Sequence, residues 1–103
     1  MIAELRETLD KAIDYHETVL EVKSYLEYNE VTEQAHILYF LLMGLVWKST
    51  ERHEKLLDED AEVYLGIEPG TLSGVSDLPA IPEMSRVPLT AYLDYLNDTY
   101  FKK

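Results

Sequence analysis

Apolar residues recur with a helical period over most of the chain, and one stretch is apolar on every side. Residues 37–47 read ILYFLLMGLVW, in which Gly44 is the one residue without an apolar side chain. This stretch is too short to cross a membrane, which needs about 20 residues. A helix that is apolar all round must be covered all round. We therefore expect residues 37–47 to form the buried centre of the fold, covered by the rest of the chain or by a second chain.

Residues 2–27 predict a long amphipathic helix. Mostly apolar residues recur at intervals of three and four, which places them on one arc of the helix surface about 120° wide. They are Ile2, Leu5, Leu9, Ala12, Ile13, His16, Val19 and Leu20. Beside the arc, carboxylates at alternating spacings form an acidic stripe roughly 21 Å long at 1.5 Å per residue. The acidic stripe consists of Glu7, Asp10, Asp14, Glu17 and Glu21.

A second helix is predicted over residues 30–58, with the apolar stretch inside it. Asn29, in the short turn before it, is a suitable N-cap. Residues 58–60, which read Asp-Glu-Asp, are expected to end it. Such a short turn predicts two antiparallel neighbouring helices. Gly44 costs about 1 kcal/mol relative to Ala inside a helix, a cost that close approach of another backbone would explain.

The composition changes after residue 60. All four prolines and three of the four glycines lie between residues 61 and 88. This predicts an irregular arm over residues 61–87, kept ordered by its many apolar residues, with a short strand at Val63 to Ile67. Pro88 suits the first position of a last helix over residues 88–101.

The pattern as a whole predicts an all-α fold in a single domain: a long antiparallel helical hairpin, a Pro/Gly-punctuated arm and a C-terminal helix. We also expect a homodimer, because the central helix carries more apolar surface than one short chain easily covers. The predicted oligomer contacts are Phe40, Leu41, Gly44, Trp47, Tyr92 and Tyr95.

Charge narrows the choice of partner. The chain carries 20 acidic and 9 basic residues, a net charge of −11. Direct nucleic-acid binding is not expected, because it needs clustered Lys and Arg, and an anionic membrane is excluded by the same reasoning. A basic protein partner is favoured. The absence of cysteine rules out disulfides and thiolate chemistry. Residues 1–10 do not resemble a signal peptide, so we expect a cytoplasmic protein.

Enzyme chemistry finds little support in the sequence. Glu33 and His36 have the spacing of a di-iron ligand pair, but the hairpin would place Lys23 opposite them. Glu51, Glu54 and Asp58 form an acidic row of the kind that helps bind Mg²⁺ in helical pyrophosphatases, without facing carboxylates from a second helix. Phosphate-binding loops and the Gly-x-Ser-x-Gly motif do not occur. We therefore expect no catalytic residues, no metal and no cofactor.

These observations favour a non-enzymatic acidic protein that regulates or inhibits a basic, nucleic-acid-handling target through its helical surface. Carboxylates spaced along a rigid helix are suited to a basic groove and are steered there by charge. Phage-borne inhibitors and nuclease immunity proteins use the same physics. The alternatives are an assembly subunit that oligomerises through the central helix, arm and C-terminal helix, and a metal enzyme built in a helical bundle.

Overall fold

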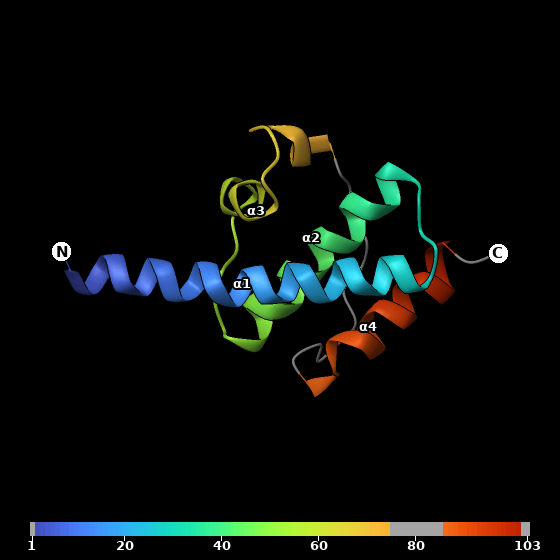
Figure 1. Ribbon diagram of the computed structural model, residues 1–103, viewed down its shortest axis with the longest axis horizontal. Helices are drawn as coiled ribbons and strands as arrows, with labels where there is room; N and C mark the ends of the chain where they lie inside the picture. The colour runs from blue at the N-terminus through green and yellow to red at the C-terminus, as the bar shows by residue number, and fades with distance from the viewer. Residues whose placement is uncertain (1, 75–85, 102–103) are drawn as a thin grey trace.

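The fold is all-α, as the sequence pattern predicts. The computed structural model describes residues 2–74 and 86–101, and this part of the chain contains helices and turns but no strand. The elements in chain order are α1 (Ile2–Tyr28), α2 (Gln34–Glu51), α3 (Asp58–Leu65), the 3₁₀ turn η1 (Thr71–Gly74), α4 (Leu89–Leu96) and the π-helical turn η3 (Asn97–Phe101). The molecule measures 50 × 31 × 24 Å, and its long axis follows α1 (Figure 1).

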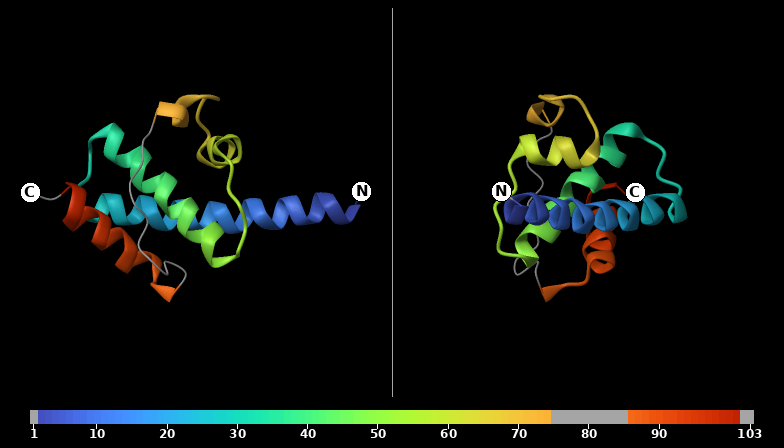
Figure 2. Two further views of the ribbon diagram at one scale, coloured as in Figure 1. Left: turned by 180° about the vertical axis from the view of Figure 1, so that it is seen from behind. Right: turned by 60° about the vertical axis from the view of Figure 1, so that its left-hand side comes forward.

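Helix α1 is longer than the body that packs against it. Its C-terminal half crosses α2, whereas its N-terminal half projects beyond the other helices (Figures 1 and 2). Helix α2 crosses α1 obliquely and does not follow it along its whole length. At the crossing, a Cβ added to Gly44 would lie 2.5 Å from Cγ2 of Val22. Gly44 therefore allows the two helices to approach closely, as its position in the apolar stretch suggests.

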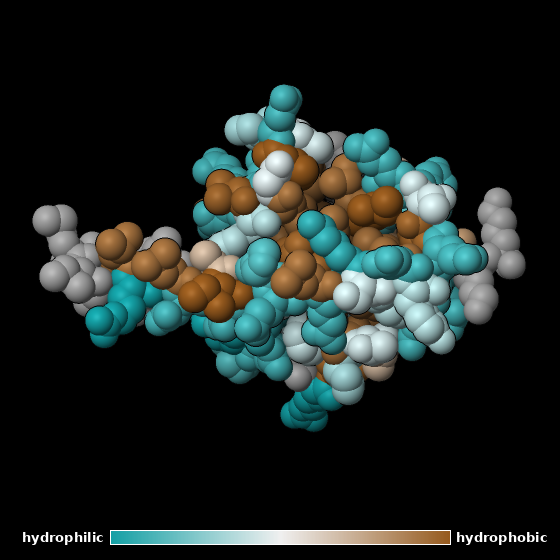
Figure 3. Space-filling model, in the orientation of Figure 1, coloured by the Kyte–Doolittle hydropathy of each residue, from teal (hydrophilic) through white to brown (hydrophobic). Residues whose placement is uncertain are grey.

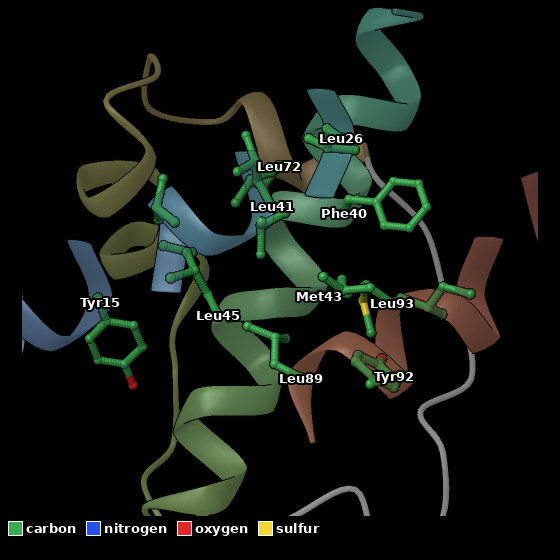
Figure 4. Packing of buried hydrophobic residues seen from close by; sticks show 14 residues of the cluster. Tyr15, Leu26, Phe40, Leu41, Met43, Leu45, Leu72, Leu89, Tyr92 and Leu93 are labelled. Carbon is green, nitrogen blue, oxygen red and sulfur yellow. The ribbon is translucent and has the colours of Figure 1, made fainter. Parts of the chain in front are cut away.

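The central apolar stretch is covered by this chain's own helices. Phe40 and Leu45 are completely buried, and α2 contacts α1, α3 and α4. Side chains from these elements and from η1 point into one cluster (Figure 4). Short elements after residue 57 therefore cover faces of α2 that were expected to need a second chain, and six of the eleven residues of the stretch are half-buried. The expectation of a homodimer loses that support.

The ends of the first two helices differ from the prediction. Helix α2 ends at Glu51, seven residues before Asp58, and Asp58 begins α3 instead of ending α2. His53 adopts a positive φ of 56°, and the Glu54 N–H donates to the Ser49 carbonyl at 2.8 Å. This pattern is a Schellman motif, which terminates a helix. It was missed because His stands where Gly is usual.

Asn29 does not cap the start of α2, as was predicted, but the end of α1. Its side-chain Nδ2 donates to the Tyr25 carbonyl at 2.9 Å, so it caps the end of α1. Glu30 follows with a φ of 57°, and the Val31 N–H donates to the Leu26 carbonyl at 2.9 Å. Helix α1 thus ends in the same motif as α2. The N-cap position of α2 is Glu33, which makes no side-chain capping bond.

The first part of the predicted arm is helical. Val63 lies in α3 and not in a strand, and Gly66 ends α3 with a φ of 70°. The buried Glu62 carboxylate then accepts a hydrogen bond from the Leu72 N–H at 3.0 Å, which anchors η1 to α3. Residues 75–85 of the arm lie outside the described part of the chain. After them, the Trp47 indole donates to the Val87 carbonyl at 2.7 Å and ties α2 to the segment before α4.

Candidate partner-binding surface

Helix α1 presents three different faces around its axis. At 100° per residue, the residues that pack in the core lie near about 60°, the exposed apolar residues near about 180°, and the acidic stripe near about 300°. The buried residues of α1 are Tyr15, Thr18, Val19, Val22 and Leu26. One helix therefore has two apolar faces, and only one of them is used by the fold.

The second apolar face is the exposed one. We call Leu5, Leu9, Ile13 and Leu20 the apolar ridge; they are 63%, 55%, 57% and 48% exposed. They belong to the arc that the sequence pattern singles out, but Val19 is the one member of that arc that the structure describes as buried. The arc that the sequence pattern singles out is therefore not the face of α1 that packs in the core. Figure 3 shows hydrophobic side chains along the projecting part of α1.

The packed half of α1 begins at a junction with α2 and α3. The rings of Tyr15 and Tyr64 stack with centroids 4.5 Å apart, which holds α3 beside α1. Arg52 Nη2 lies 3.0 Å from an Asp14 carboxylate oxygen and joins the end of α2 to the same turn. The Tyr15 hydroxyl donates to Glu54 at 3.4 Å. Burial and the neighbouring Glu54 carboxylate raise the pKa of Tyr15 to about 12.

A groove lies where α3 meets the projecting part of α1. It encloses about 380 Å³ and is lined by Ala12, His16, Asp60, Val63 and Tyr64. Val63 on α3 is 77% exposed. The groove runs beside the apolar ridge, since Leu9 of the ridge, Ala12 and His16 are spaced three and four residues apart and therefore share a helix face. Ridge and groove together form one apolar surface built from two helices.

The acidic stripe borders this surface on the side away from α3. Asp10, Glu17 and Glu21 are exposed, whereas Asp14 is paired with Arg52. The side chain of Glu7 lies outside the described part of the structure. On the other border, Asp60 of α3 is exposed and lines the groove. The apolar surface therefore has the carboxylates of the stripe on one border, together with the exposed Arg6, and the carboxylate of Asp60 on the other.

Most of the residues predicted as oligomer contacts are in the core of the single chain. Phe40, Leu41, Gly44 and Tyr92 are buried, so they do not lie on a surface that a second chain would meet. They were chosen for their apolar character, which equally suits a core. Trp47 is half-buried, and its indole N–H is already bonded to Val87. Among the six predicted contacts, Tyr95 is the most accessible, at 40% exposed.

The structure brings Glu33 and His36 together, but it does not surround them with further metal-binding side chains in the described part of the chain. His36 Nδ1 lies 3.5 Å from a Glu33 carboxylate oxygen, as their spacing predicts, and the His36 ring also lies 4.3 Å from that of Phe101. Both residues line a depression of about 450 Å³ beside the α1–α2 turn. Across residues 2–74 and 86–101, no three His, Asp or Glu side chains gather as a metal site would require.

The predicted Mg²⁺-binding row is interrupted by the end of α2. Glu51 is the last residue of α2, Glu54 follows in the connection and Asp58 begins α3. The three residues therefore do not lie on one helix. Regular spacing suggested a row only because the helix was expected to continue to residue 58.

Sequence reasoning missed the contribution of α3 to this surface. Asp60, Val63 and Tyr64 were assigned to the end of a helix and to an irregular arm. Signals for a separate short helix were present: acidic residues at 58–60 suit a first turn, and Gly66 suits a C-terminal cap. These signals were overlooked because the prolines and glycines that follow suggested an irregular segment.

Comparisons with known proteins give no relative from which a function could be inferred. No family model, no curated protein and no solved structure matches this chain. Within the described ranges, none of the helices has the length and apolar character needed to cross a membrane.

Proposed function

We propose that this protein is a non-enzymatic binding protein that regulates or inhibits a basic protein target through the exposed side of α1. The observation that carries the proposal is the projecting half of α1, whose apolar ridge is left in solvent beside the acidic stripe. An exposed apolar patch of this kind is typical of an interaction site. The stability of the fold does not explain why these residues are apolar, because no other element in the described part of the chain buries the ridge.

The charge of the chain supports a basic target. Exposed Asp10, Glu17 and Glu21 lie along one side of α1, and the net charge of the chain is −11. A surface of one sign raises the rate of encounter with a partner of the opposite sign and repels like-charged proteins. The target that fits this surface has clustered Lys or Arg around an apolar patch, as proteins that handle nucleic acids often do.

The test is affinity capture from a lysate of the source organism at low ionic strength. Asp10, Glu17 and Glu21 are changed to Lys, and Asp14 is kept because it pairs with Arg52. The matched control changes the exposed Glu27, Glu30 and Glu68 to Lys, which gives the same change in net charge away from the stripe. Bound proteins are quantified by mass spectrometry on both variants and on the wild type.

We expect the stripe variant to lose basic proteins that the wild type and the control retain. Retention should also weaken as salt rises, since surface charge interactions are screened within about 10 Å at 0.1 M salt. Equal capture by the two variants would overturn the proposal, because net charge alone would then explain retention.

A further inference from the structure

We infer that the ridge and groove bind one amphipathic helix of the target, apolar on one side and basic along both flanks. This inference rests on the proposed function and specifies what the target presents. Its components are the apolar ridge on α1, the groove beside Val63, and the carboxylates on the two borders. Each component points to a different property of the bound segment.

The spacing of the ridge favours a helix. Leu5, Leu9 and Ile13 follow one another at four-residue intervals, which is about 6 Å along the axis at 1.5 Å per residue. A row with this spacing fits between the matching rows of another helix, as in ordinary helix–helix packing. From Leu5 to Leu20 the ridge extends for about 22 Å, the length of a helix of roughly 15 residues.

The groove gives the bound helix a second wall. Val63 stands 77% exposed on α3, opposite Ala12 and His16 of α1. A helix that lies on the ridge would therefore also contact α3 along one flank. Helix-in-groove recognition uses this arrangement, with apolar anchors spaced three and four residues apart. A flat ridge without α3 would offer contact on one side only.

The charges on the borders select the partner and disfavour a second copy of this chain. Asp10 and Glu17 follow one border, which also carries Arg6, and Asp60 stands on the other, so each flank of a bound helix faces at least one carboxylate. A second α1 would bring its own acidic stripe, from a chain that also carries a net charge of −11. Like charges across an interface oppose association. A basic helix has the complementary charge on both sides.

The experiment uses the full chain and a synthetic peptide of about 16 residues, enough for the length of the ridge. The probe places Leu at positions separated by three and four residues, with Lys on both flanks and a fluorescent label. A second peptide has the same composition in an order that breaks the apolar face. A third replaces Lys by Glu. Binding is measured by fluorescence anisotropy at 150 mM salt, and we expect the first peptide to bind at least tenfold more tightly than the others.

Variants of the chain test where the peptide binds. Leu9→Gln with Ile13→Gln should weaken binding at least tenfold. The matched control is Tyr28→Gln with Leu57→Gln, two residues that are 88% and 48% exposed away from the ridge, and it should change the affinity less than twofold. Circular dichroism checks that both variants keep the wild-type helix content. Peptide binding should also slow amide exchange in residues 5–20.

The outcomes separate this inference from the proposed function. Equal affinity for the ordered and scrambled Leu/Lys peptides, or unchanged binding by the ridge variant, would overturn helix docking. The function as a charge-directed binder would still stand if the stripe variant lost its captured proteins. A dimer of the wild-type chain that disappears in the ridge variant would show that a second copy occupies the ridge, which also overturns the inference.

Discussion

The two halves of α1 belong to one uninterrupted helix but have opposite surroundings. In residues 14–28 the apolar side chains of Val19, Val22 and Leu26 are buried against the rest of the fold, whereas in residues 2–13 Leu5, Leu9 and Ile13 remain exposed. Both halves have helical periodicity, so periodicity does not distinguish them. The two sets of residues also lie on different faces of α1, and Leu20, on the ridge face of the packed half, is still 48% exposed. The difference therefore comes from what lies opposite each face of the helix. An apolar helix face is therefore evidence of a contact, but that contact need not be within the chain.

The projecting half of α1 remains helical because it continues from the packed half. An isolated helix of about 12 residues is marginal in water, because nucleation is costly. Here the packed half provides the nucleus, and the projecting half extends it. The projecting half gains little from burial and should open far more easily.

Amide exchange gives the largest expected contrast between the two halves. Residues 18–26 should exchange only through openings that approach global unfolding, which costs about 5–15 kcal/mol in small domains. Residues 6–13 should exchange through local fraying, at least about a hundredfold faster. Hydrogen–deuterium exchange read by NMR measures both segments in one sample. Equal protection would show that something covers the projecting half in solution.

A Leu→Ala substitution should lower the free energy of unfolding much more in the packed half than in the projecting half. Leu26 is 4% exposed and Leu9 is 55% exposed. Leu26→Ala should lower the free energy of unfolding by about 2–5 kcal/mol, through lost burial and the cavity left behind. Leu9→Ala should change it by less than about 0.5 kcal/mol. Urea denaturation followed by circular dichroism compares them, and similar costs would contradict the division of α1.

High pH should destabilise the packed half through Tyr15. Its pKa is raised to about 12 by burial and by Glu54, so the folded state favours the neutral phenol. This contribution is complete below pH 10, where the unfolded state is also neutral. It is lost as pH rises from 10 toward 12, by up to about 1.4 kcal/mol per pH unit.

Thermal melts between pH 9 and pH 12 measure this loss. Tyr15→Phe removes one of the tyrosines whose pKa is raised by burial, so the stability of this variant should fall less steeply above pH 10. The control is Tyr28→Phe, because Tyr28 is 88% exposed at the end of the same helix. If the stability of Tyr15→Phe and that of Tyr28→Phe fall equally steeply with pH, Tyr15 does not cause the loss of stability.

The crossing of α1 and α2 gives the smallest expected effect. Gly44→Ala would place its Cβ 2.5 Å from Cγ2 of Val22. Overpacking costs about 1–3 kcal/mol, and the better helix propensity of Ala returns about 1 kcal/mol. We expect a net loss of up to about 2 kcal/mol by chemical denaturation. In a Val22→Ala background the clash is removed, and Gly44→Ala should become stabilising.

Several elements could be read from the sequence because local chemistry determines them. Helix α1 begins and ends within a residue of its predicted bounds, since its period is long and unbroken. The last helix begins at Leu89, one residue after its predicted first position, and Pro88 is its N-cap residue. The end of α2 could not be read, because His53 and not Gly occupies the left-handed position. Helix α3 was hidden for the related reason that its end signals lie in a segment dominated by proline and glycine.

The candidate surface was predicted only in part. The acidic stripe follows from spacing alone, and Asp10, Glu17 and Glu21 are exposed as a stripe requires. The ridge consists of residues that the sequence pattern assigns to the apolar arc, but their exposure depends on where α2 and α3 lie. Asp60 and Val63 join the surface through the stacking of Tyr15 on Tyr64, a contact between residues 49 positions apart in the chain.

The sequence by itself determines which residues of α1 share a face, because a helix repeats every 3.6 residues whatever surrounds it. It also determines that Gly44 suits a close crossing and that the chain is strongly acidic. Only the tertiary structure decides which apolar face enters the core. The helices that pack on α1 cover the face that carries Val19, Val22 and Leu26, and they leave the ridge of Leu5, Leu9, Ile13 and Leu20 in solvent. The physical reason is that burial depends on what lies opposite a side chain, and periodicity carries no information about that.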